Sequence, residues 1–261
     1  MPVHHEVEAT LVVAAYDPRS IVTKIEQLTW VCEYRLLPQP SQQIHDTYFD
    51  TPQGLLRSRR FALRARKVEG KCLLTLKGQA KRLSPTVARR LEIEEPWSVA
   101  ALAAVRKTLA DHGIELRFDT DRDCGDTWRT LQAAGLAIVQ ERTTLRRLRQ
   151  VATAGLGGPR VAELAIDSVT YRFRDQVARH HELEVELKGK QDPAILQPIV
   201  AELCSASDGA LRTWPHSKLV TGTAIEHLVE EGSIDKLLDT EGNLKPDAYT
   251  VIDARVFSSG A

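Results

Sequence analysis

The sequence has little cysteine, and its four cysteines lie far apart in the chain. They are Cys32, Cys72, Cys124 and Cys204. None of them forms a CxxC pair or a cysteine–histidine spacing typical of a zinc site. We therefore expect free thiols, most of them buried, as is usual in the reducing cytosol.

An excess of one charge and a long apolar run are also missing. Lysine plus arginine and aspartate plus glutamate number 35 each, so the formal net charge is zero. A uniformly basic protein that binds nucleic acid is therefore excluded. No apolar run approaches the roughly 20 residues that a membrane helix requires, and the polar N-terminus, MPVHHEVEAT, is unlike a signal peptide. We expect a cytoplasmic protein with neither nucleic-acid nor membrane partners.

Three motifs that would explain a function in simple terms are absent. The sequence has no GxxxxGK[ST] motif, which excludes a P-loop. The glycines of residues 155–158 do not match a dinucleotide-binding fingerprint, and Ser217 has no evident base partner that would make it a nucleophile. Any function must therefore come from the arrangement of the charged residues.

Apolar spacing predicts both helices and strands, and the two types do not alternate strictly. Helices are expected over residues 17–36, 98–112, 193–204 and 217–229, with a shorter one over 127–134. Strands are expected over residues 6–12, 44–49, 61–68, 71–77, 87–95, 137–148, 160–173 and 181–188. This order favours an antiparallel α+β fold over a doubly wound sheet. We expect one domain over residues 1–230, followed by a polar tail over 231–261 that is partly disordered or packed on the domain.

The predicted strands carry charges of a single sign on one face. Arg64 and Arg66 share a face of one strand, and Glu182, Glu184 and Glu186 share a face of another. Like charges on one strand repel each other unless an opposite charge lies between them. A sheet with one face in solvent explains the alternation, and so does a closed barrel whose inward glutamates face metal ions and whose inward arginines face an anion. The period of two fits both orientations.

Several charged motifs follow one another in a set order. They are EVE at Glu6–Glu8, HDTYFDTPQGLLRSRRFALRAR, TLK, RRLEIEEP, ERTTLRR, AIDSV, HELEVELK and SKL. As an ordered set, over about residues 4–226, they resemble the CYTH family, also called triphosphate tunnel metalloenzymes. The resemblance implies an α+β fold, with a closed eight-stranded antiparallel β-barrel that has a charged interior and helices around it.

The resemblance also implies roles for individual residues. Those expected to bind the triphosphate are Arg64, Arg66, Lys77, Arg90, Arg142, Arg146 and Lys218. Those expected to bind Mg²⁺ or Mn²⁺ are Glu6, Glu8, Asp167, Glu182, Glu184 and Glu186, with Glu92 and Glu94 in support. The expected catalytic set is Glu6, Glu8, Arg64, Arg66, Lys77, Arg142, Asp167, Glu184 and Glu186. The chemistry is consistent, because guanidinium groups match phosphate oxygens and carboxylates suit hard divalent ions.

By resemblance, the expected activity is metal-dependent hydrolysis of a small-molecule triphosphate, with inorganic tripolyphosphate as the first substrate. Adenylyl cyclase activity on ATP and hydrolysis of thiamine triphosphate are the alternatives, although aromatic residues for a base or ring make up only 5% of the chain. A non-catalytic module that binds triphosphate or polyphosphate is a further alternative. A homodimer is left open.

Some positions depart from the family pattern or allow a second reading. Thr10 stands where the family's first strand usually has lysine in ExExK, and Gln140 stands where many relatives have a basic residue. Both departures favour weaker turnover. The histidine pairs at residues 4–5 and 180–181 are expected at the surface and not as metal ligands, and Tyr48 and Asp50 are expected to shape a turn.

Overall fold

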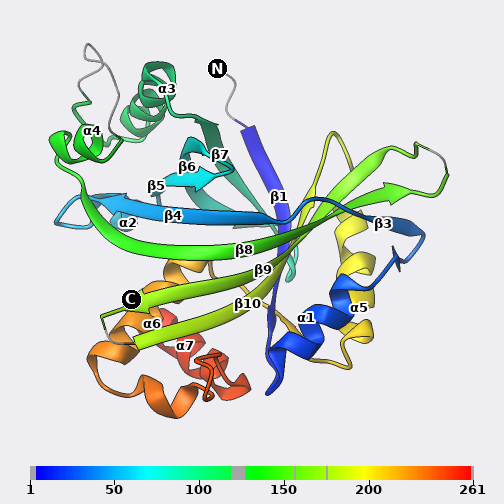
Figure 1. The fold of residues 1–261 in the computed structure, drawn as a ribbon. Coiled ribbons are helices and arrows are strands. Elements are labelled where there is room, and N and C mark those ends of the chain that lie inside the picture. Colours follow the sequence, from blue (N-terminus) through cyan, green and yellow to red (C-terminus); the bar gives the residue numbers. More distant parts are fainter. Residues whose placement is uncertain (1–3, 119–126, 156, 175, 260–261) are drawn as a thin grey trace. The chain divides into compact units, whose positions relative to one another are not determined.

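The computed structural model describes residues 4–118, 127–155, 157–174 and 176–259. Its strands are β1 His4–Val13, β2 Trp30–Val31, β3 Tyr34–Pro38, β4 Gln42–Asp50, β5 Ala62–Val68, β6 Lys71–Arg82, β7 Val87–Pro96, β8 Ala137–Thr153, β9 Arg160–Phe173, β10 Gln176–Leu187 and β11 Leu211–Thr213. Its helices are α1 Pro18–Glu26, α2 Leu55–Ser58, α3 Val99–Ala110, α4 Thr127–Ala133, α5 Leu196–Ala206, α6 Lys218–Glu230 and α7 Pro246–Ser259 (Figure 1). Two short 3-10 helices, η1 Pro193–Ile195 and η2 Ile234–Leu237, complete the set.

Eight strands are hydrogen-bonded in a closed order. The order is β8, β4, β5, β6, β7, β1, β10 and β9, and β9 pairs again with β8. The short strands β2 and β3 continue the sheet at β8, and β11 pairs with β1. The eight strands are those that the period of two predicts, so the antiparallel β-barrel flanked by helices is confirmed.

The chain divides into two compact units. The first unit comprises Met1–Glu6, Gln43–Lys81 and Arg90–Arg142. The second unit comprises Val7–Gln42, Arg82–Arg89 and Thr143–Ala261. Each unit has its own hydrophobic clusters, so the packing of each can be described separately.

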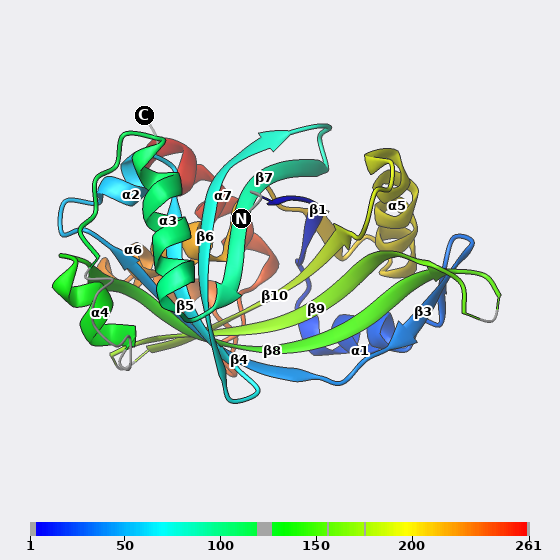
Figure 2. The ribbon, with the colours of Figure 1, turned by 90° about the horizontal axis from the view of Figure 1, so that it is seen from above.

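In the first unit, α3 covers one face of β5 and β6 (Figure 2). Leu102, Val105 and Leu109 of α3 share a cluster with Leu63 of β5 and Leu74 of β6. All five residues are fully buried. The apolar face of these two strands therefore packs on a helix, which leaves the alternate, charged face for another role.

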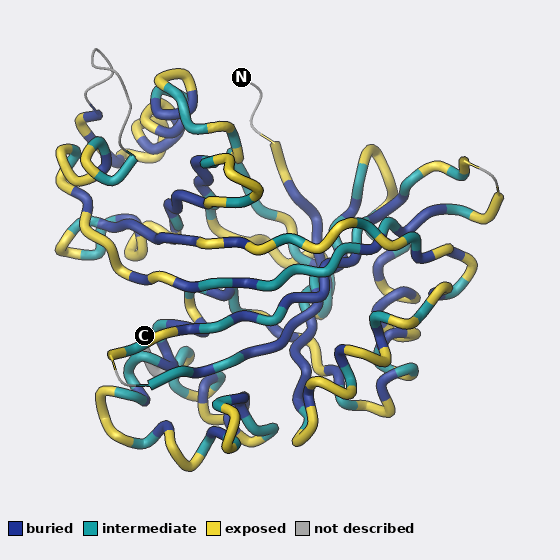
Figure 3. The backbone as a smooth tube through the Cα atoms, in the orientation of Figure 1, coloured by how far each residue is buried: buried dark blue, intermediate teal, exposed yellow. Residues whose placement is uncertain are grey.

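In the second unit, β9 and β10 run side by side over twelve register pairs. Their backbone is buried or partly buried along most of its length (Figure 3). On β10, Leu183 and Val185 belong to a cluster that also contains Ile25 of α1 and Leu203 of α5. Glu182 and Glu184 alternate with these two apolar residues and therefore lie on the opposite face of the strand.

The predicted helix over residues 17–36 is wrong beyond Glu26. The helix α1 begins after Asp17, which accepts a hydrogen bond from the backbone of Ser20, but residues 30–38 form β2 and β3. Val31 and Leu36 are buried in the same cluster as α1. Their apolar spacing suits a helix or a hairpin, and pairing with β8 decides between them.

The segment after residue 230 is packed in its described part. Ala248, Tyr249 and Ile252 of α7 are buried in a cluster with Ile225 and Leu228 of α6. The two helices lie next to each other in the second unit (Figure 1). The predicted tail, although polar in overall composition, therefore contains a helix with one apolar face.

The three cysteines that the structure describes, Cys32, Cys72 and Cys204, are free and partly buried. The expectation of free thiols is confirmed for them, while Cys124 lies outside the described residues. No helix in the described ranges combines the length and the apolar character needed to cross a bilayer.

Candidate functional site

Three arginines of the first unit converge on one carboxylate, Asp46 of β4. Arg66 forms a fork with it, with Nε–Oδ1 at 2.8 Å and Nη2–Oδ2 at 3.1 Å. Arg142 Nη2 lies 3.3 Å from Oδ2, and Arg64 Nη1 lies 3.6 Å from it. Burial opposes ionisation of Asp46, but the three guanidinium groups outweigh it and hold the pKa of this carboxyl well below its usual value.

The local register explains this convergence. Asp46 lies opposite Arg66, and Tyr48 lies opposite Arg64, in the antiparallel pair of β4 and β5. Residues two apart on a strand share a face, so all four side chains lie on one face. Asp46 was not predicted as a site residue, although its spacing of two residues from Tyr48 in HDTYFD indicates that both side chains share one face of a strand.

Tyr48 belongs to the same group. Its hydroxyl lies 3.2 Å from Arg64 Nη1 and accepts a hydrogen bond from Arg142, whose guanidinium carbon is 4.6 Å from the centre of the ring. Burial raises the pKa of Tyr48, but the arginines outweigh it and the net pKa is lowered. Asp50 shapes the turn as expected, because it accepts hydrogen bonds from the backbone of Leu56 and Arg57 at the start of α2.

Glu94 contacts two of the three arginines. Its Oε2 lies 3.2 Å from Arg64 Nη2 and 3.8 Å from Arg66 Nη1, and it accepts a hydrogen bond from Thr75 at 2.9 Å. The three arginines are thus opposed by two carboxylates, those of Asp46 and Glu94. In addition, the buried Nε of Arg64 has no hydrogen-bond partner among the described residues. The arginine group retains capacity for an anion.

A second charged group of the first unit contains Glu6, Lys77, Arg90 and Glu92. Glu6 accepts hydrogen bonds from Lys77 Nζ at 2.8 Å and from Arg90, and Lys77 also lies 3.0 Å from Glu92. Burial raises the pKa of Glu6, but Lys77 and Arg90 outweigh it and the pKa is lowered. Burial and the neighbouring Glu6 raise the pKa of Glu92 to about 7. Predicted phosphate ligands are therefore paired here with a predicted metal ligand.

Three carboxylates of the second unit form a compact acidic group. They are those of Asp167 on β9 and of Glu182 and Glu184 on β10, and one oxygen of each lies within 4.8 Å of the others. Asp167 and Glu182 are register partners. Lys218, at the first position of α6, lies between them, with its Nζ 3.0 Å from Asp167 and 2.7 Å from Glu184. It also donates a hydrogen bond to Glu182.

Arg146 of β8 completes the acidic group. Its guanidinium donates to both oxygens of Asp167, at 2.8 and 2.6 Å, and to Glu184 at 2.7 Å. Burial opposes ionisation of Asp167, but Arg146 and Lys218 outweigh it and the pKa is lowered. Burial alone would lower the pKa of Lys218, but the three carboxylates raise it well above its usual value.

The acidic group fits a hard divalent cation by the chemistry of its donors. Carboxylate oxygens are the ligands that Mg²⁺ and Mn²⁺ prefer, and the Lys218 ammonium already marks a position where a cation is stable. Glu186 differs from the group, because it pairs with Lys188 at 2.6 Å and lies opposite Glu8 in the register of β1 and β10.

The two departures from the family pattern lie next to these groups. Thr10 is the register partner of Glu184 on β10, so a lysine at this position would lie directly beside the acidic group. Gln140 is buried and accepts a hydrogen bond from Arg142 Nη1 at 3.3 Å. Gln140 therefore holds an arginine in place and adds no charge.

The expectation of surface histidines is wrong for one pair. His4 and His5 are exposed, as expected. His180 and His181 are buried, with exposed fractions of 0% and 5%. The reason is that β10 begins at Gln176, so both residues lie within the strand and not at its end.

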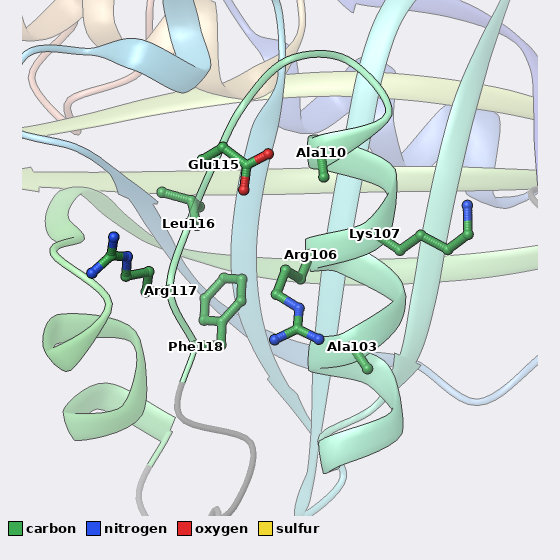
Figure 4. Close-up of a pocket in the computed structure, with 8 residues that line it drawn as sticks. All are labelled: Ala103, Arg106, Lys107, Ala110, Glu115, Leu116, Arg117 and Phe118. Carbon is green, nitrogen blue, oxygen red and sulfur yellow. The ribbon is translucent and has the colours of Figure 1, made fainter.

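A hollow of about 530 Å³ lies beside α3 (Figure 4). It is lined by Arg106 and Lys107 of α3 and by Arg117 and Phe118 of the segment that follows, together with smaller residues. None of the predicted site residues lines it. The hollow is therefore not lined by the charged residues that the sequence predicts as the site.

The chain is similar in sequence and in structure to known proteins. The sequence matches the CYTH domain over residues 19–206. Among solved structures, HpAC1 from Hippeastrum, a candidate adenylyl cyclase described as having a dominant triphosphatase activity, has a TM-score of 0.55 and 18% identity, covering 84% of this chain and 95% of its own. A candidate adenylate cyclase from Bacillus halodurans has a TM-score of 0.49 and 16% identity, covering 84% and 97%. No curated protein matches the sequence. With its closed eight-stranded barrel and a domain match over most of its length, this chain belongs to the CYTH family.

Proposed function

We propose that this protein hydrolyses a small-molecule triphosphate in the presence of Mg²⁺ or Mn²⁺, and that its substrate is inorganic tripolyphosphate. The observation that carries the proposal is the convergence of Arg64, Arg66 and Arg142, all buried, on a single aspartate. Buried guanidinium groups bind phosphate oxygens more strongly than exposed ones, because water does not screen the charges. The triphosphatase activity described for HpAC1 is consistent with this assignment.

In this proposal, the residues have distinct tasks. The three arginines bind phosphate oxygens, and Asp46, Tyr48 and Glu94 keep the guanidinium groups oriented before the substrate arrives. Because the arginines are held beforehand, little reorganisation is needed when the phosphate binds.

Asp167, Glu182 and Glu184 would hold the divalent ion in the second unit. When bound, such an ion neutralises phosphate charge and lowers the pKa of a bound water molecule. Before a metal ion binds, Arg146 and Lys218 keep the three carboxylates ionised, and the ion must then displace Lys218 from their oxygens. Each unit can be tested by its own variants.

Thr10 favours a second candidate function, a module that binds triphosphate without turnover. The lysine usual at this position in the family would add a cation opposite Glu184, and threonine adds none. If the missing charge limits turnover, Thr10→Lys should increase the rate of phosphate release from tripolyphosphate. An unchanged rate would remove this candidate's support.

The proposal is tested by incubating the protein with tripolyphosphate, ATP or thiamine triphosphate, each with Mg²⁺, with Mn²⁺ or with EDTA. We expect phosphate from tripolyphosphate that requires the metal. Cyclic AMP and pyrophosphate from ATP would instead identify a cyclase, and phosphate from thiamine triphosphate alone would identify the other alternative. Binding of tripolyphosphate without any product would identify the module.

A further inference from the structure

Glu182 of the acidic group is connected to the C-terminal helix α7 through His180. The Nε2 of His180 lies 2.6 Å from Glu182 Oε2, and its Nδ1 lies 3.2 Å from the hydroxyl of Tyr249 on α7. The three side chains have exposed fractions of 0%, 1% and 3%. Tyr249 lies beyond residues 19–206, where the CYTH domain match is found.

Both oxygens of Glu182 have a defined partner. Lys218 donates a hydrogen bond to Oε1, and His180 contacts Oε2. Lys218 lies among all three carboxylates, whereas His180 contacts only this one of them in the described structure. His180 therefore fixes the orientation of the Glu182 carboxylate, while Lys218 offsets part of the negative charge of all three carboxylates.

The contacts also define which nitrogen of His180 carries a proton. Burial and the Glu182 carboxylate raise the pKa of the Tyr249 phenol, so this group remains a hydrogen-bond donor. A carboxylate oxygen accepts, so Nε2 carries the hydrogen that His180 donates to Glu182, and the Tyr249 hydroxyl contacts the ring at Nδ1.

We propose that His180 and Tyr249 are positioning residues that orient the Glu182 carboxylate toward a divalent cation, so that the C-terminal helix contributes to the affinity of the metal site. The inference rests on the proposed function, because it assumes that Asp167, Glu182 and Glu184 bind the ion. Carboxylates that ligate metals are commonly held by such outer hydrogen bonds, and the loss of one typically costs about 10- to 100-fold in metal affinity.

His181 provides a matched control on the same strand. It is also buried, and it contacts Ser168 Oγ at 3.1 Å and Asn243 Oδ1 at 3.2 Å. Because it is the next residue on β10, its side chain lies on the opposite face from His180 and Glu182. A change at His181 thus disturbs a buried histidine that does not contact the acidic group.

The test is the dissociation constant of Mn²⁺ alone, measured by calorimetry on the full chain, together with the electron paramagnetic resonance spectrum of the bound ion. We expect His180→Leu to weaken Mn²⁺ binding by about tenfold or more and to change the spectrum. His180→Gln should restore most of the affinity, because its amide can donate to Glu182 in place of Nε2. Tyr249→Phe should give a smaller loss in the same direction, and His181→Gln should leave the affinity unchanged.

The outcomes separate the two proposals. If the parent protein binds no Mn²⁺, the metal-dependent function fails and this inference fails with it. If the parent binds Mn²⁺ and Tyr249→Phe and His180→Leu bind it equally well, only the inference is overturned. Should His180→Leu fail to fold, Tyr249→Phe and His180→Gln still decide, because both keep the size of the buried side chains. Equal losses in His181→Gln and His180→Leu would show a merely structural role and would also overturn the inference.

Discussion

At the scale of single residues, Asp46 holds together the arginine group of the first unit. It is the shared partner of Arg64, Arg66 and Arg142, and its exposed fraction is 2%. Removing one partner of a buried ion pair leaves the other charges uncompensated. The aspartate therefore stabilises the folded protein, although the same arginines are the proposed phosphate ligands.

We predict that Asp46→Asn lowers the free energy of unfolding by about 3 kcal/mol at neutral pH. The pKa of Asp46 is depressed in the folded state, so its contribution is present above its unfolded pKa, about 3.9, and is lost as the pH falls through the lower folded value. Urea unfolding of the parent and the variant should thus show a constant difference between pH 5 and 8 that narrows in stronger acid. A difference that is independent of pH would contradict this account.

Lys218 has the corresponding place in the second unit, where its ammonium lies among three carboxylates. Without triphosphate it competes with a metal ion for the same oxygens. We predict that Lys218→Met binds Mn²⁺ about tenfold or more tightly than the parent when no triphosphate is present. Repulsion between unit charges about 4 Å apart is worth about 4 kcal/mol, and a tenfold change needs only about 1.4 kcal/mol. Calorimetry checks this, and equal or weaker binding by a folded variant would refute it.

At the scale of elements, the charged groups depend on short, well-capped connections. Asp50 ends β4 and accepts hydrogen bonds from the backbone N–H groups of Thr51, Leu56 and Arg57, so it fixes α2 immediately before β5 with Arg64 and Arg66. The turn thereby sets the position of the strand that carries two of the arginines.

We predict that Asp50→Ala lowers the free energy of unfolding by about 2 kcal/mol, the upper end for lost hydrogen bonds to the first turn of a helix, because the Asp50 carboxylate is buried. Asp17→Ala is the control, since Asp17 caps α1 through a single bond at 3.1 Å in an exposed setting. Its cost should be smaller. Thermal unfolding of the two variants gives the comparison, and an equal cost would show that burial of the cap is irrelevant.

The strands and helices differ in how far the sequence predicts them. The eight barrel strands were predictable because apolar and charged residues alternate along them. In β10, for example, Leu183 and Val185 alternate with glutamates. The end of α1 was not, because Val31 and Leu36 suit a helix or a strand until their pairing partners are known. Periodicity describes one element at a time, whereas pairing depends on a distant segment.

At the scale of the whole molecule, the ordered charged motifs predicted the family and the barrel, and the family match confirms that reading. The pairing within the site could not be predicted. His180 was missed because a lone histidine gives no indication of its contacts, and Asp46 because its spacing from Tyr48 indicates a shared strand face but not the arginines around it. Lys77 was predicted as a site residue, but its pairing with Glu6, a residue 71 positions away in the sequence, was not.

The central claim is that the buried arginines of the first unit bind the phosphate groups of a triphosphate. The most direct measurement is the dissociation constant of tripolyphosphate, by calorimetry, for the parent, Arg66→Lys and the control Arg147→Lys. Arg66 forms a fork with Asp46, and lysine keeps its charge but loses the planar pair of donors. Arg147 belongs to the second unit, where it pairs with Glu26. The account predicts binding by the parent that is weakened about tenfold or more in Arg66→Lys and is unchanged in Arg147→Lys. Equal affinity in all three proteins, or no binding by the parent, would contradict it.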